Sequence, residues 1–433
     1  MPQELIHLTT RKPVVRILMI VFLIIAAVWS YFVVNWYLGN TFAENLGPSE
    51  RDLDIARMAV AMAPDDPLTH WRLALVSQRK LPPDQIGHII AEYEKAVTLS
   101  PNDYRFWTAL GVAYEQAGEH DKGEVALRRA VTLAPNYGHP HWFLGNLLLR
   151  RSRYDEAFAE LRRASEVNDE FRPQFFLLLW EIFGSDFDAL GKAIGDNPST
   201  RADFANHLLK QKKYDEGLRL WSTLSPSDKT ANKAAADSML TALIAAQRYY
   251  AAVSVWNDVA PNAESRATID RITDGGFEQV ANYGPDMVFA WQVKNVSQVQ
   301  IGVDPQSGHS GRRSLRLVFQ VRQKLEGLSA TQLVAVSPDT EYELEFFQKS
   351  QKLESGSTPY VRVSNSADNA QLALSDGAAN GDSDWQRVSL TFKTPPKCEG
   401  VTITIERGKC LDIDICPIFG TVWYDDFSLK RRN

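Results

Sequence analysis

The stretch YRFWTALGVAYEQAGEHDKGEVALRRAVTLAP, residues 104–135, decides the fold of the middle of this 433-residue chain. In its first half, residues spaced i, i+3, i+4 and i+7 share one face of an α-helix: Trp107, Leu110, Gly111 and Tyr114. In its second half, small and bulky residues again share a helical face: Gly123, Leu127 and Ala130. Small residues let two helix backbones approach closely. The stretch therefore predicts a helical hairpin that ends at Pro135.

The hairpin recurs along the chain with a period of 34 residues. Pro101 precedes Pro135 by this period, and Leu144 and Gly145 follow the corresponding pair of the first helix. Related tripeptides begin later second helices: Arg153-Tyr154-Asp155, Lys213-Tyr214-Asp215 and Arg248-Tyr249-Tyr250. The pattern W-x₂-L-G-x₂-Y, followed by a small residue, a bulky one, Ala and a terminal Pro, resembles the tetratricopeptide repeat. The resemblance implies an all-α solenoid over residues 48–261, whose concave groove holds a protein partner.

A long apolar segment lies near the amino terminus. Residues 17–34 are almost all apolar, and Asn35-Trp36-Tyr37 follows, as is typical where a helix leaves a bilayer. This predicts a transmembrane signal-anchor helix over residues 14–38. Arg11, Lys12 and Arg16 precede it and acidic residues follow, so residues 1–13 are expected in the cytoplasm. The rest of the chain is then periplasmic, on a bacterial inner membrane crossed once.

A cleaved signal peptide is the competing interpretation of the same segment. Thr41-Phe42-Ala43 has the small-x-small form of a cleavage site before Glu44. However, the apolar run exceeds the roughly 7–15 residues of a secretory core, which favours an uncleaved anchor.

Composition and missing motifs exclude several classes of function. The formal net charge of −6 argues against nucleic acid as a partner, because phosphate binding needs a basic face. The sequence has no G-x-S-x-G, H-E-x-x-H, phosphate-loop or dinucleotide motif, so we do not expect an enzyme. His139 and His141 flank Pro140 without further ligand spacing, and we expect them on the surface and not at a metal.

After about Pro261 the helical spacing stops, and alternating apolar residues separated by Gly, Pro, Asn and Asp begin. The clearest predicted strands carry apolar residues on one face: Leu315, Leu317, Phe319 and Val321; Tyr342, Leu344 and Phe346; Val388, Leu390 and Phe392; Val401, Ile403 and Ile405. Eight to ten short strands in residues 262–433 predict an all-β sandwich or jelly roll.

Three segments of this part resemble carbohydrate-binding jelly rolls of the galactose-binding-like superfamily, over about residues 268–430. They are Asp274-Gly275-Gly276-Phe277-Glu278, Gly311-Arg312-Arg313-Ser314-Leu315 and Trp423-Tyr424-Asp425-Asp426-Phe427-Ser428-Leu429. The resemblance implies a structural calcium between the opening and closing strands, where Glu278 and Asp425 stand. Alternation along the last strand would also point Asp425 into the core. The alternative is a carboxylate paired with Arg or with backbone amides.

Sugar binding requires exposed aromatic rings, and the candidates are Trp385, Tyr360 and Trp291. Each of them could instead be a packing residue, and this alternative is strongest for Trp291. No strand carries a clear aromatic pair. In an oxidising compartment one disulfide is expected. We favour Cys398 with Cys416, while Cys410 is able to replace either partner.

These observations favour a membrane-anchored periplasmic scaffold. Its repeats would bind a protein partner and its β-sandwich a glycan or a second protein, in the production of exopolysaccharide or O-antigen. One alternative is a pure protein–protein scaffold in envelope assembly or secretion. Another is a glycan-active enzyme or its accessory subunit.

Overall fold

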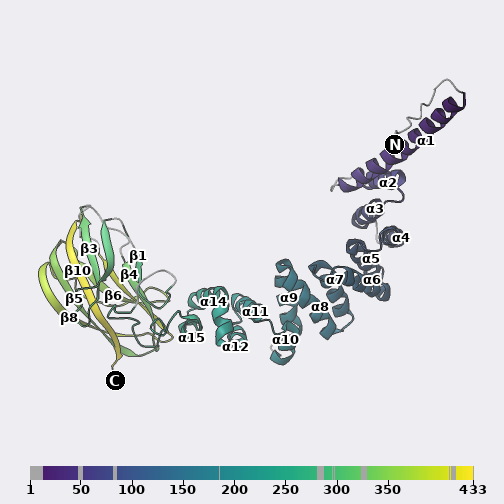
Figure 1. Cartoon of the computed structure of the whole chain (residues 1–433). Helices are drawn as coiled ribbons and strands as arrows, with labels where there is room; N and C mark the ends of the chain where they lie inside the picture. Colours follow the sequence, from purple (N-terminus) through teal and green to yellow (C-terminus); the bar gives the residue numbers. More distant parts are fainter. Residues whose placement is uncertain are drawn as a thin grey trace, which may run out of the picture. The chain divides into compact units, whose positions relative to one another are not determined.

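The computed structural model describes residues 13–46, 52–80, 85–184, 186–279, 287–294, 296, 298–322, 329–408, 410 and 416–432. The chain divides into two compact units, Met1–Asp196 and Asn197–Asn433, which are described separately. Figure 1 shows helices in the first unit, and helices followed by strands in the second. The predicted cytoplasmic tail, residues 1–13, lies outside the described residues except for Pro13.

The described part of the first unit is entirely helical. Its α-helices are α1 (Pro13–Glu44), α2 (Asp52–Met62), α3 (Pro67–Lys80), α4 (Ile86–Leu99), α5 (Tyr104–Gln116), α6 (His120–Leu133), α7 (Gly138–Arg150), α8 (Tyr154–Val167), α9 (Arg172–Phe183) and α10 (Phe187–Ile194). A short 3₁₀ turn, Asp169–Phe171, precedes α9. Among the described helices, α1 alone is long and apolar enough to cross a membrane, by length and composition.

The predicted close packing of two helices is present in the hairpins α5–α6 and α7–α8. An ideal Cβ on Gly111 of α5 would lie 2.6 Å from Cγ of Leu127 in α6. The equivalent Gly145 of α7 meets Leu161 of α8 at 2.7 Å in the same way. Only glycine permits this approach, so the two hairpins are built alike, as the 34-residue period predicts.

The second unit begins with helices α11 (Pro198–Lys210), α12 (Tyr214–Ser222), α13 (Pro226–Ala231), α14 (Lys233–Ala245) and α15 (Tyr249–Val259). The last of these packs against the β-sandwich. Tyr250 donates a hydrogen bond from its hydroxyl to the Val336 carbonyl at 3.0 Å, and the ring of Tyr249 lies against Gly400.

Two five-stranded antiparallel sheets form the sandwich. Sheet A has the strand order β1-β4-β9-β6-β7, and sheet B the order β2-β3-β10-β5-β8. The strands of sheet A are β1 (Gln292–Lys294), β4 (Ser329–Ala335), β9 (Gly400–Arg407), β6 (Pro359–Asn365) and β7 (Gln371–Leu374). Those of sheet B are β2 (Val299–Asp304), β3 (Ser314–Val321), β10 (Ile418–Arg431), β5 (Glu341–Ser355) and β8 (Gly381–Lys393).

The core lies between the two sheets and contains residues from all four strands that the sequence predicted most clearly. Leu317, Leu344 and Ile403 are fully buried there, and Leu390 packs against the same cluster. An all-β sandwich with apolar side chains alternating inward is therefore confirmed.

Candidate carbohydrate site on the outer face of sheet B

An aromatic cluster lies on the face of sheet B that points away from the core. It consists of Trp385 on β8, Phe347 on β5 and His309 from the segment that joins β2 to β3. The imidazole of His309 stacks on the ring of Phe347 with 3.6 Å between centroids, and it meets the ring of Trp385 edge-on at 5.7 Å. The ammonium of Lys349 lies 5.9 Å from the Trp385 centroid. No single strand supplies this cluster, so its members are not adjacent in sequence.

Register explains how Phe347 and Trp385 come to share this face. Phe346 pairs with Val388 across β5 and β8, and both point toward the core. The next residue along β5, Phe347, therefore points outward. Trp385 lies three positions before Val388 on β8, an odd number, so its side chain also points outward. The segment before β3 then lays His309 across them.

Two acidic residues hold this segment in place. Asp425 accepts hydrogen bonds from the backbone N–H groups of His309, at 2.6 Å, and Asp426, at 2.7 Å. The carboxylate of Asp426 contacts Nδ1 of His309 at 2.7 Å and accepts from the hydroxyl of Ser310 at 2.5 Å. Asp425 is fully buried, and this burial, with the nearby charge of Asp426, raises its pKa to about 6 against the N–H bonds that lower it.

The predicted orientation of Asp425 was wrong in one respect. A β-bulge interrupts the pairing of β10 with β5 between Asp425 and Ser428, and Asp426 has a φ of 52°. The bulge shifts the alternation by one residue. Consequently Phe427 faces the core, while Asp425 lies opposite Phe347 on the outer face and is buried beneath the segment that carries His309.

The predicted calcium ligands are held by backbone amides. Glu278 accepts from the N–H groups of Arg312, at 2.6 Å, and Arg313, at 2.7 Å, through the same oxygen. Both oxygens of Asp425 likewise accept N–H bonds. Within the described residues, no group of three or more His, Cys, Asp or Glu side chains is arranged to hold a metal. The geometry fits the amide-held alternative, and calcium stays a prediction.

Of the three residues predicted to bind a sugar, the structure leaves two at the surface, on opposite faces. Tyr360 lies on the outer face of sheet A, where its hydroxyl donates to Glu406 at 3.3 Å, and burial together with this neighbouring carboxylate raises its pKa. Trp385 lies on sheet B. Trp291 is fully buried between Phe277 and Phe427, so it packs in the core and does not reach a ligand.

The cysteine pairing also differs from the favoured one. Cys410 is joined to Cys416, with 5.7 Å between their Cα atoms, and Cys398 is free and buried. The thiol of Cys398 donates to the Gly400 carbonyl at 3.3 Å. It is thereby fixed at the start of β9, whereas Cys410 follows the end of that strand and comes close to Cys416.

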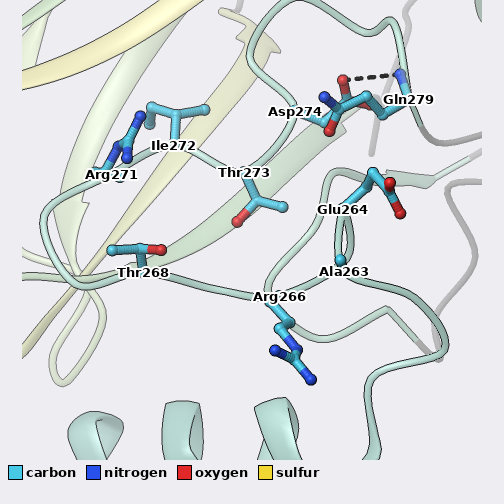
Figure 2. A pocket seen from close by; sticks show the side chains of 9 residues that line it. All are labelled: Ala263, Glu264, Arg266, Thr268, Arg271, Ile272, Thr273, Asp274 and Gln279. Atoms are coloured by element: carbon cyan, nitrogen blue, oxygen red, sulfur yellow. Dashed lines mark hydrogen bonds between the residues drawn. The ribbon is translucent and has the colours of Figure 1, made fainter.

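A polar pocket of about 350 Å³ lies in the segment that connects α15 to the sandwich. Figure 2 shows its lining, in which Asp274 accepts a hydrogen bond from the backbone N–H of Gln279 at 3.1 Å. Arg266 and Arg271 point in different directions in this view. The lining contains no aromatic side chain. It therefore lacks the stacking surface that the aromatic cluster offers.

The repeats of the first unit form a hollow of about 610 Å³ lined largely by first-helix residues. Its lining includes Trp71 of α3, Tyr104 and Arg105 of α5, and His139 and Phe143 of α7. His139 is exposed, as predicted, and Arg105 is exposed as well. Thr108 lines the same hollow but is only 8% exposed, and its hydroxyl donates to the carbonyl of Tyr104 at 2.7 Å.

Comparison with known families agrees with this architecture. Residues 104–137 match the tetratricopeptide repeat, and residues 270–412 match a carbohydrate binding domain. The E3 ubiquitin-protein ligase CHIP of Arabidopsis thaliana is 28% identical over 100 residues, 23% of this chain and 36% of its own length. The small glutamine-rich tetratricopeptide repeat-containing protein 2 of Mycosarcoma maydis is 30% identical over 82 residues, 19% of this chain and 23% of its own. The matched part of the chain thus spans 36% and 23% of the lengths of these two relatives.

Solved structures resemble separate parts of the chain. A crystal structure of MamA is 18% identical, with a TM-score of 0.31, covering 41% of this chain and 95% of MamA. A CBM4 structure is 16% identical, with a TM-score of 0.28, covering 37% of this chain and 99% of the CBM4 chain. By its family matches, the chain combines a tetratricopeptide-repeat region, of the kind that binds proteins, with a carbohydrate binding domain at its carboxy-terminal end.

Proposed function

We propose that this protein is a membrane-anchored periplasmic scaffold in the production of an exopolysaccharide or O-antigen. The repeats hold a protein partner in the hollow between α3, α5 and α7, and the β-sandwich binds a glycan chain. The observation that carries the glycan part is the aromatic cluster of Trp385, His309 and Phe347 on the outer face of sheet B.

The cluster has the two properties that a sugar site needs. An aromatic ring with a free face packs against the apolar face of a pyranose, and Trp385 is partly exposed. Polar side chains at its edge can bond sugar hydroxyl groups. Exposed Arg387 on β8, its half-buried ion-pair partner Glu345 on β5, and Asp426 beside His309 supply them.

The test is binding of the full chain, in detergent micelles, to an array of bacterial polysaccharides. Trp385→Ala should reduce affinity at least about tenfold, because stacking rings dominate such sites. The matched control is Tyr360→Ala, which removes a partly exposed aromatic ring from the opposite face of the sandwich and should leave affinity unchanged.

The possible results separate the alternatives. Loss of binding with Tyr360→Ala and not with Trp385→Ala would move the site to sheet A. A folded chain that binds no polysaccharide would contradict glycan binding and favour a protein–protein scaffold. Turnover of a bound polysaccharide would indicate the glycan-active enzyme instead.

A further inference from the structure

Helix α1 does not end where its apolar stretch ends. The apolar residues run to Val34, but the helix continues for ten more residues to Glu44. Within the apolar stretch the side chains are exposed, for example Phe22 and Trp29 at 69% each. Beyond it, Gly39 and Ala43 are buried. One helix therefore has two environments, an uncovered apolar part and a packed end.

At its closest approach the packed end meets α2 through small residues. An ideal Cβ on Gly39 would come within 2.8 Å of the Ala59 carbonyl oxygen and 2.9 Å of Cβ of Ala63. Ala43, Ala56 and Ala59 have no exposed surface. Such a contact requires that the two helix backbones touch, so any larger side chain at position 39 would separate them.

A partly buried hydrogen bond fixes the same end to the turn before α3. Asn40 donates from Nδ2 to Oδ2 of Asp66 at 2.7 Å. The other oxygen of Asp66, which is 4% exposed, accepts from the backbone N–H of Leu68 at the start of α3. The end of α1 is thus bonded to the first hairpin of the solenoid as well as packed on it.

We infer that the last two turns of α1 are the terminal cap of the solenoid, so that the apolar helix is kept in the mature protein. A solenoid needs a cap because its end repeats would otherwise expose an apolar face. Cleavage after Ala43, the competing interpretation of the sequence, would remove Gly39, Asn40 and Ala43 from the packed structure. The apolar stretch and the packed end belong to one continuous helix, Pro13–Glu44.

The geometry places the repeats at the membrane surface. This placement rests on the membrane anchor of the proposed function. The 18 residues 17–34 span about 27 Å as a helix, close to the roughly 30 Å hydrocarbon thickness of a bilayer. Gly39 then follows Val34 after only about 8 Å of helix. The first hairpin is therefore held at the headgroup layer, and its partner is one presented close to the membrane.

The cap is tested by introducing one cysteine at a time into the full chain and measuring its reactivity with a maleimide, with peptide mapping to separate it from the natural cysteines. Ala43→Cys should react at least about tenfold more slowly than Met58→Cys, which stands on the exposed side of α2, because labelling requires local opening of the cap. Adding Gly39→Leu should raise the rate at position 43 to that of position 58. The matched control is Gly87→Leu, a helical glycine with nothing within 4 Å of its Cβ, which should not change it.

Three results would overturn the inference. A mature chain that begins at Glu44 by intact mass would show that the helix is removed. Equal labelling at positions 43 and 58 in the parent chain would show that the end of α1 is not packed. No effect of Gly39→Leu would place the contact elsewhere. Membrane extraction with alkaline carbonate reports the anchor separately, so a peripheral protein with a protected Ala43→Cys would contradict the anchor and leave the cap standing.

Discussion

His70, Trp107 and His141 occupy one position in three successive repeats. Each directs a ring nitrogen at the carbonyl oxygen of the proline six residues earlier, at 2.8, 2.9 and 3.0 Å respectively. In the two histidines the second nitrogen faces a carboxylate, Glu92 or Glu160. Because carbonyls and carboxylates only accept hydrogen bonds, His70 makes both of its bonds only as the charged imidazolium.

The pH dependence of stability follows from His70. Burial lowers its pKa, but the hydrogen bonds to Glu92 and Pro64 outweigh burial, and the net pKa is raised. A raised folded pKa gives a stabilisation that is complete below the ordinary value of about 6.5 and is lost as the pH rises through the folded value. We expect His70→Gln to cost about 1.5–3 kcal/mol at pH 5 and much less at pH 9. Thermal unfolding across that range measures it.

Trp107→Phe is the matched control for this prediction. It removes the equivalent bond to Pro101 with no titrating group, so its cost should be the same at both pH values. A cost of His70→Gln that is equally independent of pH would contradict the charged form.

Asp425 should make the folded chain less stable as the pH rises. Its pKa of about 6 exceeds the usual value of about 3.9, so the folded chain prefers the neutral acid. The contribution of Asp425 to the free energy of unfolding is most favourable below about pH 4 and is lost as the pH rises through about 6. With a chelator present, we expect the thermal midpoint of the sandwich to fall between about pH 4 and 6, and Asp425→Asn to reduce that fall.

Calcium added in the same titration tests the predicted ion. An ion held by Glu278 and Asp425 favours the charged carboxylates and restores the midpoint at pH 7 in the parent but not in Asp425→Asn. An unchanged midpoint would instead support carboxylates held by backbone amides alone.

At the scale of the element, the repeats share a turn as well as helices. The residue two before four of the second helices, α6, α8, α12 and α15, has a left-handed backbone: Gly118 (φ 79°), Ser152 (58°), Lys212 (62°) and Gln247 (61°). Glycine adopts this conformation without the steric cost that other residues have. We expect Ser152→Gly to raise the free energy of unfolding by about 0.5–1 kcal/mol, measured by urea denaturation.

The reciprocal variant at the equivalent turn provides the control. Gly118→Ser should lower the free energy of unfolding by a similar amount, because no atom lies within 4 Å of a Cβ there and only the backbone is changed. If the two substitutions change stability with the same sign, the turn is not the cause.

Elements with a strict period could be predicted from sequence, and features that depend on a break in the period could not. The 34-residue spacing predicts the hairpins. It could also have predicted the packing of His141, which lies 34 residues after Trp107. The predicted surface position of His141 was wrong, because the residue is only 6% exposed. The bulge at Asp426 reverses the alternation in β10 and gives no sequence signal. The aromatic cluster needs the pairing of β5 with β8, which alternation alone does not specify.

At the scale of the whole molecule, the boundary predicted between residues 261 and 262 crosses a packed contact in the second unit. The indole N–H of Trp256 in α15 donates to the carbonyl of Ser265 at 2.8 Å, and the side chain of Asn257 exchanges two hydrogen bonds with the backbone of Ala267. The ring of Trp256 also lies 6.5 Å from that of Phe289. The last repeat therefore covers residues that a cut at 261 would expose to water.

We expect a fragment of residues 262–433 to be less stable than one of residues 197–433, because the uncovered surface includes Phe289 and Val336. Guanidinium denaturation of both fragments, followed by tryptophan fluorescence, gives the difference. Gly400→Ala in the longer fragment is the selective variant, since its Cβ would lie 2.7 Å from the Tyr249 ring and push α15 away. It should lower the stability of the longer fragment toward that of the shorter one and leave the shorter fragment unchanged. Equal stability of the two parent fragments would show that the sandwich folds without the last repeat, and that the contact only positions the glycan domain.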